Sequence, residues 1–314
     1  MGGTHNGFDR RVVLNPGTIH NLALISYGVM LCALPAARYH AGSVLAAGTR
    51  VRLQQCATGI GVAAAQGTRA GGDRYREVRG VKPTLLLLPG LLCDEAVWRA
   101  QIIALADRYE CRVADYRQVD SLPAMAELAL ACAPGNFLLA GHSMGGRVAF
   151  EMLRHAPQRV SKLILMDTGY LPRGRGEHGE REAAERQRLV ALAYSQGMRG
   201  MGREWLSGML PKARWQDSEL IESILAMVER KTPAIHTAQV RALLERPDAS
   251  DVLPGIACPT LLLCGREDRW SPLARHEEMA QLIAGARLVV IENAGHMTTM
   301  ERPDEVSAAM REFL

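Results

Sequence analysis

From Thr84 onward, short apolar runs alternate along the chain with longer amphipathic stretches. The apolar runs occupy residues 84–88, 109–115, 137–140, 162–166, 260–264 and 288–291. Continuous apolar runs of this length are typical of parallel strands that are buried on both faces. The amphipathic stretches between them predict helices at residues 97–107, 123–132, 145–156, 272–283 and 303–313. Strands and helices in alternation predict an α/β fold with an open, mostly parallel, doubly wound sheet.

One long interval, between Tyr170 and Pro254, breaks this alternation because it contains no strand candidate. Its amphipathic pattern predicts four helices, at residues 181–196, 198–209, 217–231 and 233–245. Ligands bind at the carboxyl edge of open α/β sheets, so we expect these helices to form a cap over that edge. The predicted division is therefore a core of residues 81–169 and 255–314 and a helical cap of residues 170–254.

Residues 1–80 differ from the rest, since they contain loose Gly/Ala-rich stretches without sustained periodicity. We expect a poorly structured extension here, although a true start of translation near Val81 is an alternative. The apolar segment from Leu22 to Ala37 is shorter than the ~20 residues of a membrane-spanning helix, so no stable membrane insertion is expected. Arg10 and Arg11 precede this segment and leave an export signal as a minor alternative.

Composition and charge narrow the class of protein. The 314 residues are 48% hydrophobic and 22% charged, which suits one large or two small globular domains. Residues 1–80 hold nine arginines and three acidic residues and carry +6, so the remainder of the +4 chain carries −2. A weakly acidic body argues against a nucleic-acid partner. Seven scattered cysteines without a CxxC pair argue against a zinc site and favour a cytoplasmic protein.

The stretch Gly141-His-Ser-Met-Gly145 is a G-x-S-x-G motif between a predicted strand and a predicted helix. A serine on such a sharp turn holds its Oγ clear of the backbone, and glycines on either side avoid steric collision. The helix that follows favours developing negative charge near its first residues. Ser143 is therefore the candidate nucleophile; the alternative is an ordinary glycine-rich turn that contains a serine.

A serine needs a base to take its proton, and His296 is the candidate, because it follows the last predicted strand. Asp268, which follows the strand at residues 260–264, is the preferred acid to orient that imidazole. Asp167 at the end of the preceding strand and the neighbouring Glu267 are rivals. Among the other histidines, we expect His142 to point away around the turn. His155, His178, His236 and His276 are expected on exposed polar faces.

The oxyanion of an acyl-transfer reaction needs two preorganised N–H groups. The candidates are the amides of Met144, after the nucleophile, and Leu91, in the loop that follows the first strand. Trp98, Trp270 and Met297 are candidate walls of the substrate pocket. The arginine-rich run at residues 173–188 also contains glutamates, so we expect a solvated helix face rather than an anion clamp.

Four motifs together resemble the α/β-hydrolase superfamily over roughly residues 83–314. They are the Leu88-Pro-Gly-Leu loop, the serine turn, Gly265-x-x-Asp268-x-x-x-Pro272 and Gly295-His296-x-x-x-x-Glu301-x-Pro303. The chain is similar to small capped bacterial carboxylesterases, enol-lactonases and meta-cleavage-product hydrolases alike. It departs from the usual pattern at Pro89-Gly90, where most relatives have His-Gly, and it lacks their Arg-Gly-x-Gly loop after the second strand.

The resemblance and the residues imply a serine hydrolase of the α/β-hydrolase fold, acting on a small carboxylic ester or lactone. Ser143, His296 and Asp268 would pass through an acyl-enzyme intermediate, with a small acyl compound as the partner and no metal or organic cofactor. The alternatives are a C–C bond hydrolase of diketone ring-fission products and a catalytically silent binding protein.

Overall fold

The computed structural model describes residues 82–314. The predicted extension, including the apolar segment from Leu22 to Ala37, lies outside the described residues. Within the described part, no helix is long and apolar enough to cross a membrane.

Six parallel strands form a single sheet in the order β2-β1-β3-β4-β5-β6. They are β1 (Thr84–Leu88), β2 (Glu110–Val113), β3 (Phe137–His142), β4 (Val160–Met166), β5 (Thr260–Gly265) and β6 (Arg287–Ile291). All six strand predictions are confirmed, and no strand end differs from its predicted position by more than two residues. The central strands β1, β3 and β5 are almost wholly buried, which explains their continuous apolar sequences.

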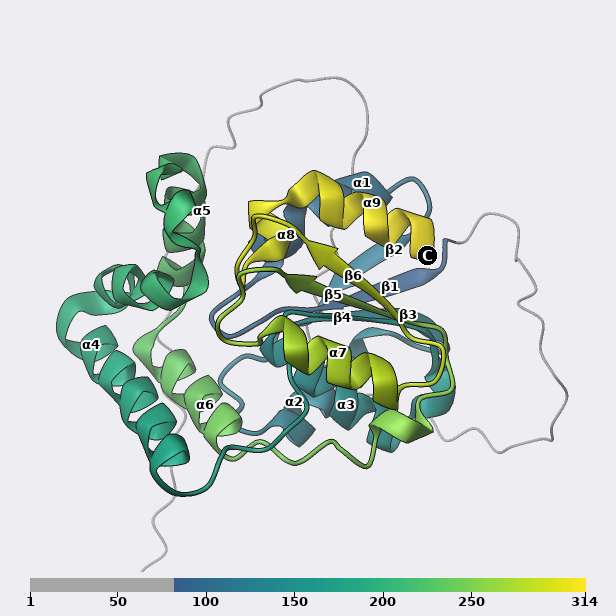
Figure 1. The fold of residues 1–314 in the computed structure, drawn as a ribbon, viewed down its shortest axis with the longest axis horizontal. Helices are drawn as coiled ribbons and strands as arrows, with labels where there is room; N and C mark the ends of the chain where they lie inside the picture. The colour runs from purple at the N-terminus through teal and green to yellow at the C-terminus, as the bar shows by residue number, and fades with distance from the viewer. Residues whose placement is uncertain (1–81) are drawn as a thin grey trace, which may run out of the picture. The chain divides into compact units, whose positions relative to one another are not determined.

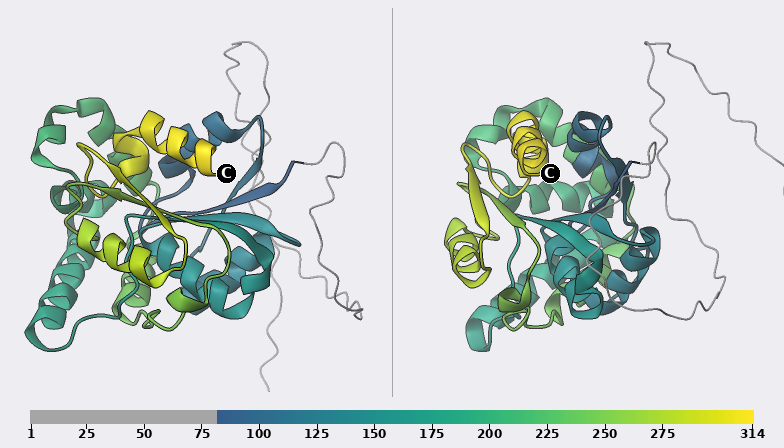
Figure 2. Two further views of the ribbon diagram at one scale, coloured as in Figure 1. Left: turned by 45° about the vertical axis from the view of Figure 1, so that its right-hand side comes forward. Right: turned by 90° about the vertical axis from the view of Figure 1, so that its right-hand side faces the viewer.

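Helices cover both faces of this sheet, so the doubly wound α/β architecture is confirmed (Figures 1 and 2). One face carries α1 (Arg99–Leu105), α8 (Thr298–Glu301) and α9 (Pro303–Phe313), and the other carries α2 (Leu122–Cys132), α3 (Met144–His155) and α7 (Leu273–Leu282). The helix predicted at residues 97–107 is shorter than expected. The Asp94 carboxylate caps the Ala96 amide and starts a 3-10 turn, Glu95–Trp98, before α1 begins.

The insertion between β4 and β5 is helical, as predicted. It contains α4 (Gly176–Met209), α5 (Ser218–Glu229) and α6 (Pro233–Leu244). Gly197 interrupts α4 with a φ of 75°, which is the boundary expected between two separate helices. Figure 1 shows the three helices beside the sheet, at the ends to which the strand arrows point. The carboxyl edge of the sheet and the helical cap therefore enclose the region where a ligand is expected.

Candidate active site

Ser143 lies on a strained turn between β3 and α3, with a φ of 54° and a ψ of −115°. The chain crosses other backbone closely there. A Cβ atom on Gly141 would lie 2.6 Å from the Gly145 carbonyl oxygen, and one on Gly145 would lie 2.1 Å from the Leu88 carbonyl oxygen. Only glycine fits at these two positions, so the spacing of the motif follows from the contacts between strand, turn and helix.

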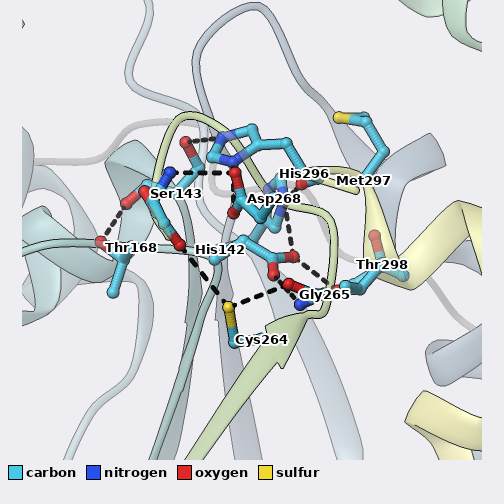
Figure 3. A network of polar contacts seen from close by, with 12 residues as sticks. His142, Ser143, Thr168, Cys264, Gly265, Asp268, His296, Met297 and Thr298 are labelled. Carbon is cyan, nitrogen blue, oxygen red and sulfur yellow. Dashed lines mark hydrogen bonds and ion pairs between the residues drawn. The ribbon is translucent and has the colours of Figure 1, made fainter. Parts of the chain in front are cut away.

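A chain of hydrogen bonds links Ser143, His296 and Asp268 (Figure 3). The Ser143 Oγ lies 2.8 Å from His296 Nε2, and His296 Nδ1 lies 2.8 Å from Asp268 Oδ2. The other oxygen of Asp268 accepts hydrogen bonds from the amides of Trp270 and Ser271 at 2.8 and 2.9 Å. Burial acts to raise the pKa of Asp268, but the His296 ring and the two amides outweigh it and lower the pKa. The carboxylate is thus held ionised against the imidazole.

The rival acids occupy different positions. Asp167 accepts hydrogen bonds from the Gly265 amide at 3.1 Å and from Thr298 Oγ1 at 2.5 Å. Its nearest imidazole is that of His142, whose Nε2 lies 3.5 Å away. Glu267 is exposed to solvent. Of the three carboxylates considered from sequence, Asp268 is the one that contacts His296.

The expected orientation of His142 is wrong. Its ring turns inward, where Nε2 donates to the His296 carbonyl oxygen at 2.8 Å, and the two ring centroids lie 5.6 Å apart. Burial acts to lower the pKa of His142, but contacts with Asp167 and Cys93 outweigh it and raise the pKa. The side chain therefore supports the loop that carries His296.

Two other histidines also differ from expectation, whereas His155 and His178 are exposed as predicted. His236 and His276 are buried, at 1% and 0% exposure. His276 accepts a hydrogen bond from the Thr168 amide through Nε2 at 3.1 Å, so it serves as an interior partner rather than as part of a polar face.

Glu301 is a buried residue near the site to which the sequence analysis assigned no role. Its carboxylate accepts hydrogen bonds from the amides of Gly295 and Met297, each at 2.9 Å, on either side of His296. The available signal was its place in the Gly295-His296-x-x-x-x-Glu301 motif. Burial raises the pKa of Glu301 to about 7, although the two amides act in the opposite direction. Glu301 thus holds the backbone of the histidine loop.

The amides of Leu91 and Met144 donate to no other group within the described part of the chain. Their neighbours, in contrast, are engaged: the Ser143 amide donates to the Met166 carbonyl at 2.8 Å, and the Leu92 amide donates to Gln239 Oε1 at 2.8 Å. Leu91 and Met144 line the same cavity as Ser143, so their two unengaged N–H groups are candidate donors for an oxyanion.

A cavity of about 750 Å³ contains these groups. Ser143 and His296 line it, and so do Leu91, Met144, Met297 and Trp270, together with Trp205 and Met209 from α4. Trp98 does not line it, contrary to expectation. Its indole is completely buried and packs edge-on against His142, 6.4 Å between ring centroids, so it forms core beneath the site.

The arginine-rich run is not wholly a solvated face. Arg181 and Arg186 line the cavity, and Arg186 is 8% exposed, with its guanidinium 5.1 Å from the centre of the Trp270 ring. The sequence shows the balance of arginines and glutamates in this run, but it does not show which of them turn inward.

Asp167, Cys264 and Asp268 lie close together, with one ligand atom of each within 4.8 Å of the others. Each carboxylate already accepts hydrogen bonds at both oxygens. Burial raises the pKa of the Cys264 thiol, which donates toward the carbonyls of Gly265 and Ser271. Hydrogen bonds within the protein therefore account for this cluster, and a neutral thiol is a poor metal ligand.

The fold and the site together define an enzyme of the α/β class of hydrolases: a strained serine turn, a cap and a serine–histidine–aspartate chain at the carboxyl edge of a parallel sheet. The chain belongs to the alpha/beta hydrolase family, whose sequence model matches residues 85–309.

Similar proteins include several with named activities. A pimeloyl-(acyl-carrier protein) methyl ester esterase of Nitrosomonas europaea is 26% identical over 73% of this chain and 94% of that protein. A solved thermophilic esterase from Thermogutta terrifontis, with malate bound, is 30% identical with a TM-score of 0.66, covering 74% of this chain and 89% of its own. A 2-hydroxy-6-oxo-6-phenylhexa-2,4-dienoate hydrolase of Comamonas testosteroni is 29% identical over 56% of this chain and 62% of that protein.

Proposed function

We propose that the protein is a serine hydrolase that cleaves a small carboxylic ester or lactone, with Ser143 as nucleophile, His296 as base and Asp268 as the orienting acid. The observation that carries this proposal is the continuous hydrogen-bonded chain from the Ser143 hydroxyl through the His296 ring to the Asp268 carboxylate. Similarity to two proteins named as esterases supports the ester substrate.

In the first step, His296 Nε2 removes the Ser143 proton as Oγ bonds to the acyl carbon, and the carbonyl electrons move onto oxygen. The amides of Leu91 and Met144 stabilise that oxyanion. The tetrahedral intermediate collapses as His296 returns the proton to the leaving alkoxide, which departs as an alcohol. Water then attacks the acyl-enzyme, with the same imidazole taking its proton. The second tetrahedral intermediate collapses as His296 returns that proton to Ser143 Oγ, which releases the carboxylic acid and regenerates the serine hydroxyl.

Asp268 supports both steps through the imidazole. It accepts from Nδ1, which leaves Nε2 free to take the serine proton, and it stabilises the imidazolium that forms. The buried environment strengthens that interaction because it excludes water. Trp270, Met297 and cap residues form part of the cavity wall that a substrate would face, so the proposed partner is a small acyl compound.

The test is labelling with a fluorophosphonate followed by mass mapping of the modified peptide. Labelling of the peptide that contains Ser143, together with hydrolysis of short aryl esters or lactones, is the expected result. An unlabelled, inactive protein would favour the catalytically silent alternative. Cell fractionation would test the cytoplasmic location, which we include in the proposal because the seven cysteines show no paired spacing.

A C–C bond hydrolase is the second candidate, favoured by the similarity to the Comamonas testosteroni enzyme. The same three residues would act, but the leaving group would be a carbon atom rather than an alkoxide. Ring-fission diketones tested beside the esters distinguish the two, since a C–C hydrolase would turn over the diketone with the higher kcat/KM.

A further inference from the structure

The cavity that contains Ser143 is strongly cationic. Among the residues that the structure describes, six arginines line it and two glutamates, Glu182 and Glu185, do so. The arginines come from the core and from the cap: Arg147, Arg181, Arg186, Arg246, Arg269 and Arg275. An excess of one charge in a partly enclosed cavity attracts ligands of the opposite charge.

Two of these arginines share a single carboxylate within the protein. Arg246 forms a bidentate pair with Glu182, at 2.7 and 2.8 Å, and Arg186 Nε donates to the same carboxylate at 3.0 Å. Burial acts to raise the pKa of Glu182, but both arginines outweigh it and lower the pKa to about 2. Glu185 is paired with Arg188, which does not line the cavity. No glutamate of the cavity wall is left to neutralise the other arginines.

Arg147 and Arg275 form no ion pair with any described residue. Arg147 donates through Nη1 to the Leu171 carbonyl at 2.9 Å, and no other residue between 82 and 314 accepts a hydrogen bond from its guanidinium. The two side chains converge at Gly169. A Cβ atom there would lie 3.2 Å from Arg147 Nη2 and 3.0 Å from Arg275 Nη1. The absent side chain at Gly169 thus leaves room for two guanidinium groups to approach one another.

This arrangement is unfavourable without a counter-ion. Burial first, and then the charges of Arg246, Arg275 and Arg186, lower the pKa of Arg147, and they outweigh the charge of Glu182, which acts to raise it. Guanidinium nevertheless keeps its proton in proteins, so the repulsion remains as an unfavourable interaction between charges. An anion bound between Arg147 and Arg275 would relieve it.

The two arginines also lie near the chemistry. Arg147 follows Ser143 by four residues, one turn of α3, which is about 6 Å along the helix axis. Ser143, Arg147 and Arg275 all line the same cavity. A single small molecule can therefore reach both.

We infer that Arg147 and Arg275 form a subsite for an oxyanion group, a carboxylate or a phosphate, carried by the substrate that Ser143 attacks. The planar guanidinium fork matches the paired oxygens of both groups. This inference rests on the proposed function and narrows it from small esters in general to esters with a negatively charged end. Gly169 serves the subsite by leaving space for both arginines.

Matched substrates test the inference in the full-length protein. Monomethyl glutarate and methyl valerate have the same acyl chain length, but only the first carries a carboxylate at its far end. We expect kcat/KM to favour monomethyl glutarate by at least about tenfold, the usual strength of a charge-assisted hydrogen bond. Arg147→Gln and Arg275→Gln should each reduce this preference by a similar factor, mainly through KM.

Three further variants distinguish the effect of the positive charge from the effect of the guanidinium geometry and from general damage to the protein. Arg147→Lys keeps the charge without the fork and should restore only part of the preference. Gly169→Ala should weaken it by displacing the Arg275 side chain, whose Cδ would lie 2.6 Å from the new methyl group. Arg203→Gln makes the same change of charge on an exposed residue of α4 outside the cavity and should leave the preference as in the wild type.

Binding measured by calorimetry separates this inference from the proposed function. Glutarate should bind the Ser143→Ala variant, and adding Arg147→Gln should abolish that binding. Inorganic phosphate that binds more tightly than glutarate would assign the subsite to phosphate-bearing esters. If neither ester is hydrolysed but glutarate still binds through Arg147, the proposed chemistry fails and the subsite stands. Equal kcat/KM for the two esters, without glutarate binding, overturns the subsite and leaves the hydrolase intact.

Discussion

The backbone amide of His296 donates a hydrogen bond to the carbonyl oxygen of Met209 at 2.8 Å. Met209 is the last residue of α4, so the cap contacts the backbone of the proposed base directly. A Cβ atom on the preceding Gly295 would lie 2.6 Å from the same oxygen, which shows how closely the two segments approach. The cap therefore contacts the histidine loop as well as lining the cavity.

Replacing Ser143 with alanine should lower turnover of any ester by at least about 10³-fold, because no other described hydroxyl is hydrogen-bonded to the His296 ring. The change removes one oxygen at the surface of a cavity, so the melting temperature should stay close to that of the wild type. Ester kinetics and thermal unfolding measure the two effects. Substantial residual turnover in a folded Ser143→Ala protein would exclude Ser143 as the nucleophile.

Asp268→Asn should reduce kcat by up to about 10⁴-fold, because an amide favours the wrong imidazole tautomer in His296. Asp167→Asn is the matched control: it changes a buried carboxylate that contacts Gly265, Thr298 and His142 rather than the His296 ring. We expect Asp167→Asn to lower stability more than kcat. Steady-state kinetics of both variants would distinguish the two acids. If Asp167→Asn lowered kcat more than Asp268→Asn did, the orienting acid would be Asp167, which follows β4.

The local sequence pattern was sufficient to predict the sheet and the serine turn. Buried parallel strands are continuously apolar, and the turn requires glycines at fixed spacing. It could also rank Asp268 above Asp167, since loop position limits which acid reaches His296. It could not orient His142 or place Trp98, because both depend on packing between elements distant in sequence. The direction in which cap side chains such as Arg186 point also depends on tertiary contacts, so the sequence alone could not predict it.

Glu301→Gln should change how stability depends on pH. The folded state raises the pKa of Glu301 from its usual 4.5 to about 7, so between these values the folded protein binds more protons than the unfolded chain. Stability supplied by this group is therefore present below pH 4.5 and is lost as pH rises through 7. Relative to the variant, the wild type should lose roughly 1–3 kcal/mol across this window.

Urea unfolding at pH 4.5, 6 and 8 measures this difference. Glu312→Gln serves as the control, because that carboxylate is exposed and paired with Arg287 at the surface. A free energy difference between wild type and Glu301→Gln that does not change with pH would show that folding leaves the pKa of Glu301 unchanged. Glu301→Gln should also lower kcat by a larger factor than it raises KM. The reason is that Glu301 holds the His296 loop but lies outside the cavity wall.

Trp205→Ala should change which acyl groups the enzyme accepts. Trp205 comes from α4 and lines the cavity, so loss of its indole enlarges the space available to a substrate. Activity toward longer acyl esters should rise relative to acetate esters, while labelling by a small fluorophosphonate should change little.

Leu206→Ala is the control. Leu206 is 1% exposed and does not line the cavity, so its truncation should cost about 2–5 kcal/mol of stability without altering chain-length preference. A uniform loss of activity toward all esters and the small probe in Trp205→Ala would indicate damage to the His296 loop through Met209 and would contradict a role in selecting the acyl group.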